Sequence, residues 1–140
     1  MEKTRIERAI EYITKLFQGN GDGHDLSHSL RVYKNAMSIA KAEGQGEEEM
    51  IALSALLHDC DDHKLFHTEN NANARSFLQE AGLSGERIEE ICRNINSVSF
   101  SKNRGRVPET IEGKIVQDAD RLEAIGAIGI CLLYTSDAAD

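Results

Sequence analysis

The sequence has no tryptophan, a single proline and few aromatic residues, which make up 5% of its 140 residues. Strands are enriched in aromatic and β-branched residues, and the turns between strands often use proline. The composition therefore favours helices over a β-sandwich or barrel. Hydrophobic residues make up 40% and charged residues 29% of the chain, as in ordinary globular domains. The length suits one domain with its own core.

Patterns that would indicate disulfides, a membrane or secretion are also missing. The three cysteines, Cys60, Cys92 and Cys131, stand at irregular spacing and form neither a disulfide framework nor a zinc-ribbon pattern. Cys60 and Cys92 are therefore predicted to be reduced packing residues. No apolar run reaches membrane-spanning length, and the charged start MEKTRIERAI lacks a signal-peptide core. We expect a cytoplasmic protein with no membrane partner.

Basic residues are in the minority. The formal net charge is −8, from 16 basic and 24 acidic residues. A nucleic-acid binder carries a basic footprint, so we expect no nucleic-acid partner. The charge still allows a small phosphorylated ligand held by a few cations and a metal ion. The sequence leaves the oligomeric state open, and a homodimer is compatible with it.

The last ten residues, CLLYTSDAAD, resemble, residue for residue, the translation of a transposase adaptor used in preparing sequencing libraries. The resemblance implies that residues 131–140 are not native and that the natural chain continues differently after about Ile130. The alternative is a natural polar tail. On the first interpretation, residues 1–130 form a single domain that is incomplete at its C-terminus.

Apolar residues recur at helical spacing along nearly the whole chain. Pro108 suits the first turn of a helix, and glycines or capping residues separate the segments. The pattern predicts six helices, over residues 4–17, from Asp25 to before Gly44, over 46–63, over 69–79, from Ser84 through Ile95, and from Pro108 through Leu122. Without a repeat or linker between them, they indicate one all-α domain.

Charged side chains gather at the end of the third predicted helix, in ALLHDCDDHK (residues 55–64). An unpaired charge in a core is costly, so these groups either enter solvent at a helix end or bind a metal. His58 and Asp59 would project about 100° apart on a helix and could share an ion between them. Asp62 follows His58 at i+4 and would lie on the same face.

Two further candidate ligands stand among apolar residues. His28 lies in HDLSHSLRVYKNAMSIA and Asp120 in IVQDADRLEAIG, where Asp118 is a competing candidate. Two imidazoles and two carboxylates form a mixed nitrogen and oxygen set. Such a set suits Mn, Fe, Co, Ni or Mg better than the thiolate-rich sites typical of structural zinc.

The segments HSLRV, LLHDCDDH and DADRL, in that order, resemble the HD-domain superfamily of metal-dependent phosphohydrolases, and in particular its small stand-alone bacterial members. The resemblance covers residues 22–130. It implies an HD-domain helical bundle in which His28, His58, Asp59 and Asp120 bind one divalent metal ion, with Mn favoured. It also implies that Asp62 is a catalytic residue that handles the attacking water.

The resemblance further implies hydrolysis of a phosphate ester or anhydride, with a nucleotide as the default substrate. Residues expected to contact it are His63, Lys64, Lys102, Arg104 and Arg121. The alternative is a solvent-exposed position for the first four, and an ion pair with Glu123 for Arg121. These cations exceed what a monophosphate requires. A nucleoside triphosphate cut to monophosphate and pyrophosphate is therefore favoured. The alternatives are a 5′-nucleotidase acting on nucleoside monophosphates and a non-catalytic sensor that binds metal and nucleotide.

Overall fold

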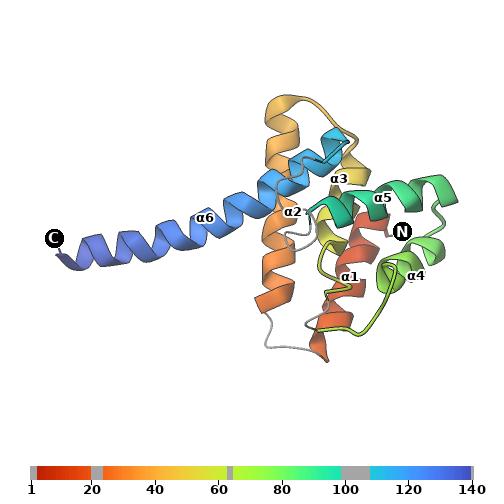
Figure 1. Ribbon diagram of the computed structural model, residues 1–140, viewed down its shortest axis with the longest axis horizontal. Coiled ribbons are helices and arrows are strands. Elements are labelled where there is room, and N and C mark those ends of the chain that lie inside the picture. Colours follow the sequence, from red (N-terminus) through yellow and green to blue (C-terminus); the bar gives the residue numbers. More distant parts are fainter. Residues whose placement is uncertain (1–2, 20–23, 63–64, 99–107, 140) are drawn as a thin grey trace.

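The structure is a computed structural model that describes residues 3–19, 24–62, 65–98 and 108–139, with side chains described as far as residue 125 except at residue 24. The described residues contain no strand. They form six helices: α1 (Arg5–Gln18), α2 (His24–Glu43), α3 (Glu48–Leu57), α4 (Ala72–Glu80), α5 (Gly85–Val98) and α6 (Ile111–Ala139) (Figure 1). The prediction of an all-α fold is confirmed.

The centre of the fold is α3. Every residue from 50 to 57 is buried, because α1, α2, α5 and α6 all pack against this helix. A helix that is apolar on all sides is typical of such a central position. The predicted apolar stripes of the helices around it face the core and include Ala9, Ile13, Phe17, Ile88, Ile91, Cys92 and Ile95.

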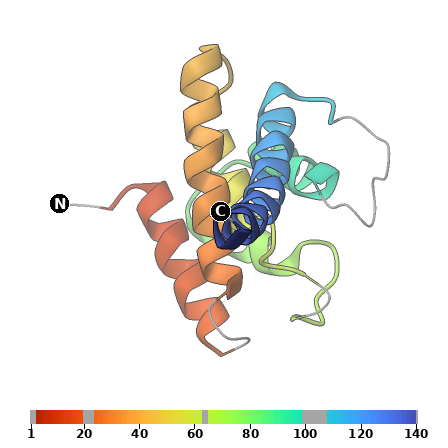
Figure 2. The ribbon, with the colours of Figure 1, turned by 90° about the vertical axis from the view of Figure 1, so that its left-hand side faces the viewer.

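The fully buried face of α2 is not formed by its largest apolar side chains. Ser29, Val32 and Ala36 are fully buried, whereas Leu30 and Tyr33 are only half-buried. This face of α2 packs against both α3 and α6, and Figure 2 shows α6 nearly end-on beside α2. Small side chains let helices approach closely. The cluster of buried apolar residues shared by α2, α3 and α6 contains three of them, Ala36, Ala55 and Ala119.

Several helix ends differ from the prediction by a few residues. Asp25 lies inside the first turn of α2 and does not cap it. Pro108 precedes α6, and the hydroxyl of Thr110 accepts the Gly113 N–H at 3.0 Å in the manner of a helix cap. Gly44, with φ of +64°, ends α2 as predicted.

The largest difference concerns the third helix. It ends at Leu57, and residues 58–61 form a turn. The N–H of His58 bonds to Ala55 and that of Asp62 to Asp59, three residues back in each case. His58, Asp59 and Asp62 therefore do not share one helical face, and that prediction is wrong. We call residues 58–62 the motif turn.

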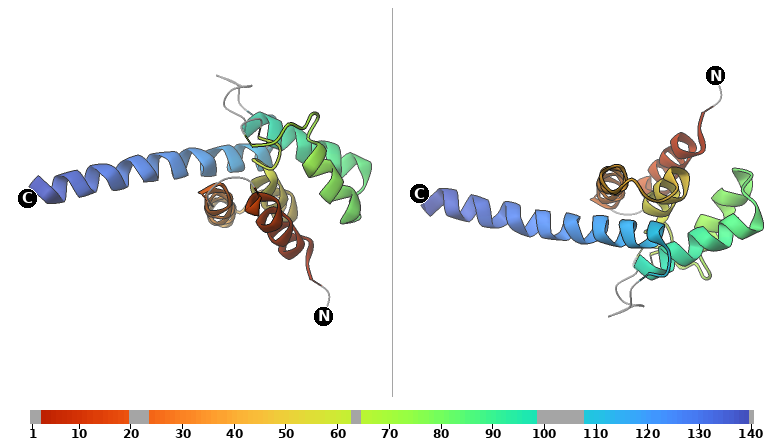
Figure 3. Two further views of the ribbon diagram at one scale, coloured as in Figure 1. Left: turned by 90° about the horizontal axis from the view of Figure 1, so that it is seen from below. Right: turned by 90° about the horizontal axis from the view of Figure 1, so that it is seen from above.

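The C-terminal part of α6 projects away from the other helices (Figures 1 and 3). Leu122 is 50% exposed and Ile125 is 64% exposed. The helix continues through Ala139. The origin of these ten residues stays a prediction. None of the described helices is long and apolar enough to cross a membrane.

Candidate metal centre

His58 forms the floor of the candidate site. It follows the last residue of α3, and its side chain is 5% exposed. Its Nδ1 lies 2.7 Å from the carbonyl oxygen of Ala55. A carbonyl oxygen can only accept, so Nδ1 carries a proton and Nε2 is left facing the site. Ligating histidines commonly donate their other ring N–H in this way, which fixes the orientation of the ring.

Two side chains from other helices meet His58. His28 comes from α2 and Asp120 from α6, and Nε2 of His28 lies 3.0 Å from Oδ1 of Asp120. Nε2 of His58 lies 3.7 Å from the same oxygen. Two ligand atoms that each bind one ion at about 2.1 Å can be no more than roughly 4.2 Å apart. Both distances therefore fit a shared ion.

Asp59 adds a second carboxylate at the same point. Its Oδ2 lies 3.3 Å from Nε2 of His58 and 3.9 Å from Nε2 of His28. The structure thus brings all four predicted ligands together. The side chains of His28, Asp59 and Asp120 are 30%, 29% and 31% exposed, so the site is open to solvent above the buried His58.

The electrostatics of the site favour a cation. Burial alone would lower the pKa of His58, but attraction to Asp59 and contacts with Asp120 outweigh it and raise the pKa to about 9. Burial would raise the pKa of Asp120, yet hydrogen bonds to His28 and His58 hold it well below its usual range. The two carboxylates therefore stabilise positive charge between them, whether a proton or a metal ion supplies it.

A second contact joins α2 and α6 one turn further along. Arg31 follows His28 by three residues, Glu123 follows Asp120 by three, and the two form an ion pair. This pair keeps the two helices aligned beside the site. Glu123, the alternative partner of Arg121, is thus paired with Arg31. Arg121 itself is exposed, next to Asp120 on α6.

The remaining predicted site residues are placed as follows. Asp62 ends the motif turn and is half-buried, whereas Asp118, the competitor of Asp120, is exposed on α6. His63, Lys64, Lys102 and Arg104 lie outside the described residues. The structure therefore does not test their predicted contacts with the substrate.

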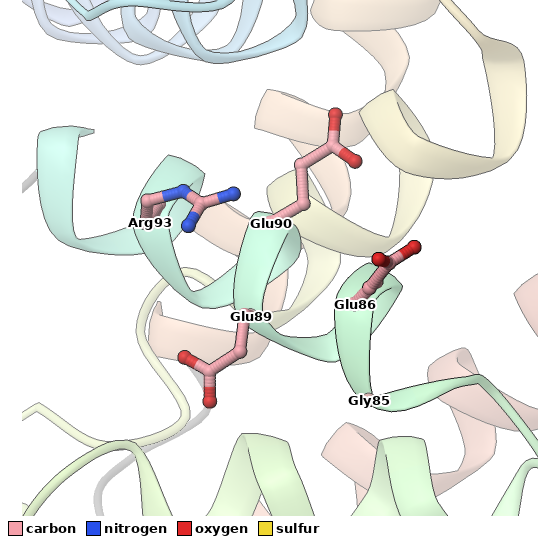
Figure 4. A pocket seen from close by; sticks show the side chains of 5 residues that line it. All are labelled: Gly85, Glu86, Glu89, Glu90 and Arg93. Carbon is pink, nitrogen blue, oxygen red and sulfur yellow. The ribbon is translucent and has the colours of Figure 1, made fainter.

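A recess on α5 is a poor alternative site. It is lined by Gly85, Glu86, Glu89, Glu90 and Arg93, and the side chains point in different directions (Figure 4). Glu89 is also paired with Arg75. At the metal centre, by contrast, the ligand atoms of His28, His58 and Asp120 all lie within 4.8 Å of one another, and Asp59 lies within 3.9 Å of both imidazoles. The metal centre is therefore the candidate site.

Comparison with known proteins identifies the family. Residues 25–125 match the HD domain, and this range contains all four residues of the candidate metal centre. The chain belongs to the HD domain family. The helical bundle and the resemblance found in the sequence are confirmed by this match.

Relatives of the HD domain described here come from bacteria and a virus. The uncharacterized protein YpgQ of Bacillus subtilis (strain 168) is 34% identical over 95% of this chain and 66% of its own length. The uncharacterized protein L803 of Acanthamoeba polyphaga mimivirus is 35% identical over 89% of this chain and 58% of its own length. The chain thus spans less than two thirds of the length of each of these two relatives.

A solved structure shares the architecture of this HD domain. It is the crystal structure of an HD-superfamily hydrolase from Bacillus thuringiensis, which superposes with a TM-score of 0.73 at 33% identity. The superposition covers 97% of this chain and 68% of that one. At this identity the likeness extends to the family as well as to the fold.

Sequence reasoning gave no role to one residue close to the metal centre. Asp61 lies inside the motif turn, and its carboxylate accepts hydrogen bonds from the start of α4. The sequence could have pointed to it only indirectly, because these partners are backbone N–H groups, which any residue except proline supplies.

Proposed function

We propose that this chain is a metal-dependent phosphohydrolase that acts on a nucleotide. One observation carries the proposal: His28, His58, Asp59 and Asp120, from α2, the motif turn and α6, bring nitrogen and oxygen donors to one point. The donor set fits one divalent cation such as Mn, Fe, Co, Ni or Mg, with Mn favoured. When bound, such an ion polarises a phosphoryl oxygen and lowers the pKa of a water molecule.

Residues of the chain would activate the attacking water and hold the site in place. Asp62 orients the attacking water or takes its proton, as the bond from phosphorus to the leaving oxygen breaks and the bond to the water oxygen forms. The structure supports this role through position, because Asp62 closes the turn that begins with His58 and Asp59. His58 stays fixed by its bond to Ala55 and does not need to reorient.

We favour a nucleoside triphosphate, cut to monophosphate and pyrophosphate. Local positive charge in a chain of net charge −8 favours such a substrate: Arg121 is exposed beside Asp120, and Lys64, Lys102 and Arg104 are further cations of the sequence. A single phosphate next to the metal requires fewer of them. Arginine and lysine are the usual partners of the non-reacting phosphate oxygens.

The product distinguishes the candidate activities. The purified protein is incubated with Mn and separate nucleoside mono- and triphosphates, and the phosphate products are resolved by anion-exchange chromatography. Pyrophosphate together with a monophosphate is expected. Orthophosphate released from monophosphates, with triphosphates untouched, would indicate a 5′-nucleotidase. Binding of metal and nucleotide without turnover would indicate a sensor module.

A further inference from the structure

The helix α4 begins without a cap of its own. Its N-cap residue, Asn71, has φ of 57° and makes no side-chain cap hydrogen bond. The first N–H groups of a helix have no partner inside the helix, and an uncapped end leaves them unsatisfied. A side chain at the N-cap usually accepts from the second or third helical residue. Those residues are Asn73 and Ala74 in α4.

Asp61 supplies the missing cap, although it lies 12 and 13 positions before the two residues concerned. Its Oδ1 accepts the N–H of Asn73 at 2.8 Å, and its Oδ2 accepts the N–H of Ala74 at 3.0 Å. The hydroxyl of Thr68 also donates to Oδ1, at 2.6 Å. A negative charge at a helix N-terminus is stabilised by the helix dipole as well. The thiol of Cys60 is a fourth, weaker donor, 3.6 Å from Oδ2. The carboxylate therefore has four donors and lies in a favourable field.

The start of α4 also binds the backbone of the motif turn. The side-chain amide of Asn73 donates to the carbonyl oxygen of Cys60 at 2.8 Å, so two consecutive residues of the turn are attached to the first turn of α4. Cys60 itself is fully buried. Asp59 directly precedes this pair and Asp62 directly follows it. Neither can shift far without breaking the contacts to α4.

We propose that Asp61 is a positioning residue of the metal centre. By capping α4 it fixes the turn that presents Asp59 to the ion and Asp62 to the attacking water. The inference rests on the proposed metal centre and goes beyond it, because it assigns part of the site's geometry to a residue that does not touch the ion. A residue that only stabilised the fold would leave metal affinity and coordination geometry unchanged in the folded protein.

The decisive variant is Asp61→Asn. It keeps the size of the side chain and removes the charge. It also replaces one acceptor oxygen by an NH₂ group, which cannot accept from a backbone N–H or a hydroxyl. We expect Mn affinity, measured by calorimetry, to fall about 10- to 100-fold, the usual effect of losing a contact that orients a ligand. The visible absorption spectrum of the Co-loaded protein, which reports coordination geometry, should change as well.

Tyr12→Phe is the matched control. The Tyr12 hydroxyl donates to the carbonyl oxygen of Asn73 at 3.0 Å, so its loss removes a tertiary hydrogen bond from the same turn of α4 while leaving Asp61 in place. The melting temperature should fall in both variants. Mn affinity and the Co spectrum should match those of the wild type in Tyr12→Phe alone.

The outcomes separate this inference from the proposed function. A wild-type protein that binds neither Mn nor Co overturns the proposed metal centre and the inference with it. A folded Asp61→Asn variant with wild-type affinity and spectrum overturns the inference alone. If Asp61→Asn does not fold, Thr68→Val, which removes only the hydroxyl donor of Thr68, takes its place. A Co spectrum that differs from that of the wild type then supports the inference, and an unchanged spectrum overturns it.

Discussion

Two acidic residues on α6 lie two positions apart, and only one of them faces His28. Asp120 lies 3.0 Å from His28, whereas Asp118 is exposed. We expect Asp120→Asn to weaken Mn binding by more than the roughly 10–100-fold that loss of an outer contact costs, because a ligand is lost. Asp118→Asn removes the same charge from the same helix and should bind Mn like the wild type. Calorimetric titration of both variants tests the assignment, and equal affinities would contradict it.

Asp62 differs from its neighbours because we assign it to the water and not to the ion. Asp62→Asn should keep the fold and the bound metal while turnover falls by about two orders of magnitude, the usual scale of general acid–base catalysis. Metal content by elemental analysis and kcat from product release are the two measurements. Loss of metal would make Asp62 a ligand. Unchanged turnover would leave it without a catalytic role.

The sequence predicted the site residues better than the residues that support them. His28, His58, Asp59 and Asp120 were found because side-chain chemistry and the order of motifs mark them, and the structure places them around one point. Asp61 was not found, because its partners are mainly backbone groups of a helix whose start depends on the tertiary fold. The prediction that Cys60 and Cys92 are reduced packing residues agrees with two free, buried thiols.

At the scale of helices, the periodic pattern predicts well which helices exist and less well at which residues they begin and end. The core face of α5 follows from spacing alone, since Ile88, Ile91 and Ile95 recur every three or four residues and all are buried. The start of α4 was placed at residue 69, but Asn70 and Asn71 adopt positive φ, which is incompatible with a helix. Hydrogen bonds to Asp61 and Asn96, both distant in sequence, help to hold that turn.

The burial of α3 predicts where the fold is most sensitive to mutation. Leu56 is fully buried in the main core, whereas Leu122 on α6 is 50% exposed. Leu56→Ala should reduce the free energy of unfolding by about 2–5 kcal/mol through lost burial and an added cavity. Leu122→Ala should change it by less than about 0.5 kcal/mol.

Urea unfolding followed by circular dichroism measures both changes. The pair is matched in chemistry, so a difference between the two variants reports burial alone. A small loss in both variants would show that α3 is not the centre of the core in solution. A large loss in both would show that the exposed stretch of α6 is covered in solution.

For the whole molecule, the site joins segments that are far apart in the chain. His28 and Asp120 are separated by 92 positions and meet because α2, α3 and α6 pack closely through small residues such as Ala36, Ala55 and Ala119. Hydrophobic spacing predicts that each helix has a buried face. It does not predict which helices pair, and the family resemblance supplied that information here.

A metal ion should therefore stabilise the entire fold, and it should do so more strongly at higher pH. Ligands from α2, the motif turn and α6 exist as a set only in the folded state, so an ion at about 100 times its Kd adds roughly 2.7 kcal/mol to the free energy of unfolding. Metal binding needs the lone pair of His58 Nε2, and a proton competes for it. In the metal-free protein the pKa of His58 is raised from 6.5 to about 9.

The sign of the pH effect follows from that shift. Without metal, the charged His58 stabilises the fold below its unfolded pKa of 6.5, and this contribution is lost as the pH rises through about 9. Over the same range the proton competes less with the ion, so metal affinity increases.

The rise in melting temperature on adding a fixed concentration of Mn should therefore be larger near pH 8.5 than near pH 6.5, and a chelator should abolish it at both. Calorimetric scans of the metal-free and Mn-loaded protein at the two pH values provide the measurement, with Asp120→Asn as the variant in which the rise should be absent. An equal rise at both pH values would show that His58 does not exchange a proton for the ion.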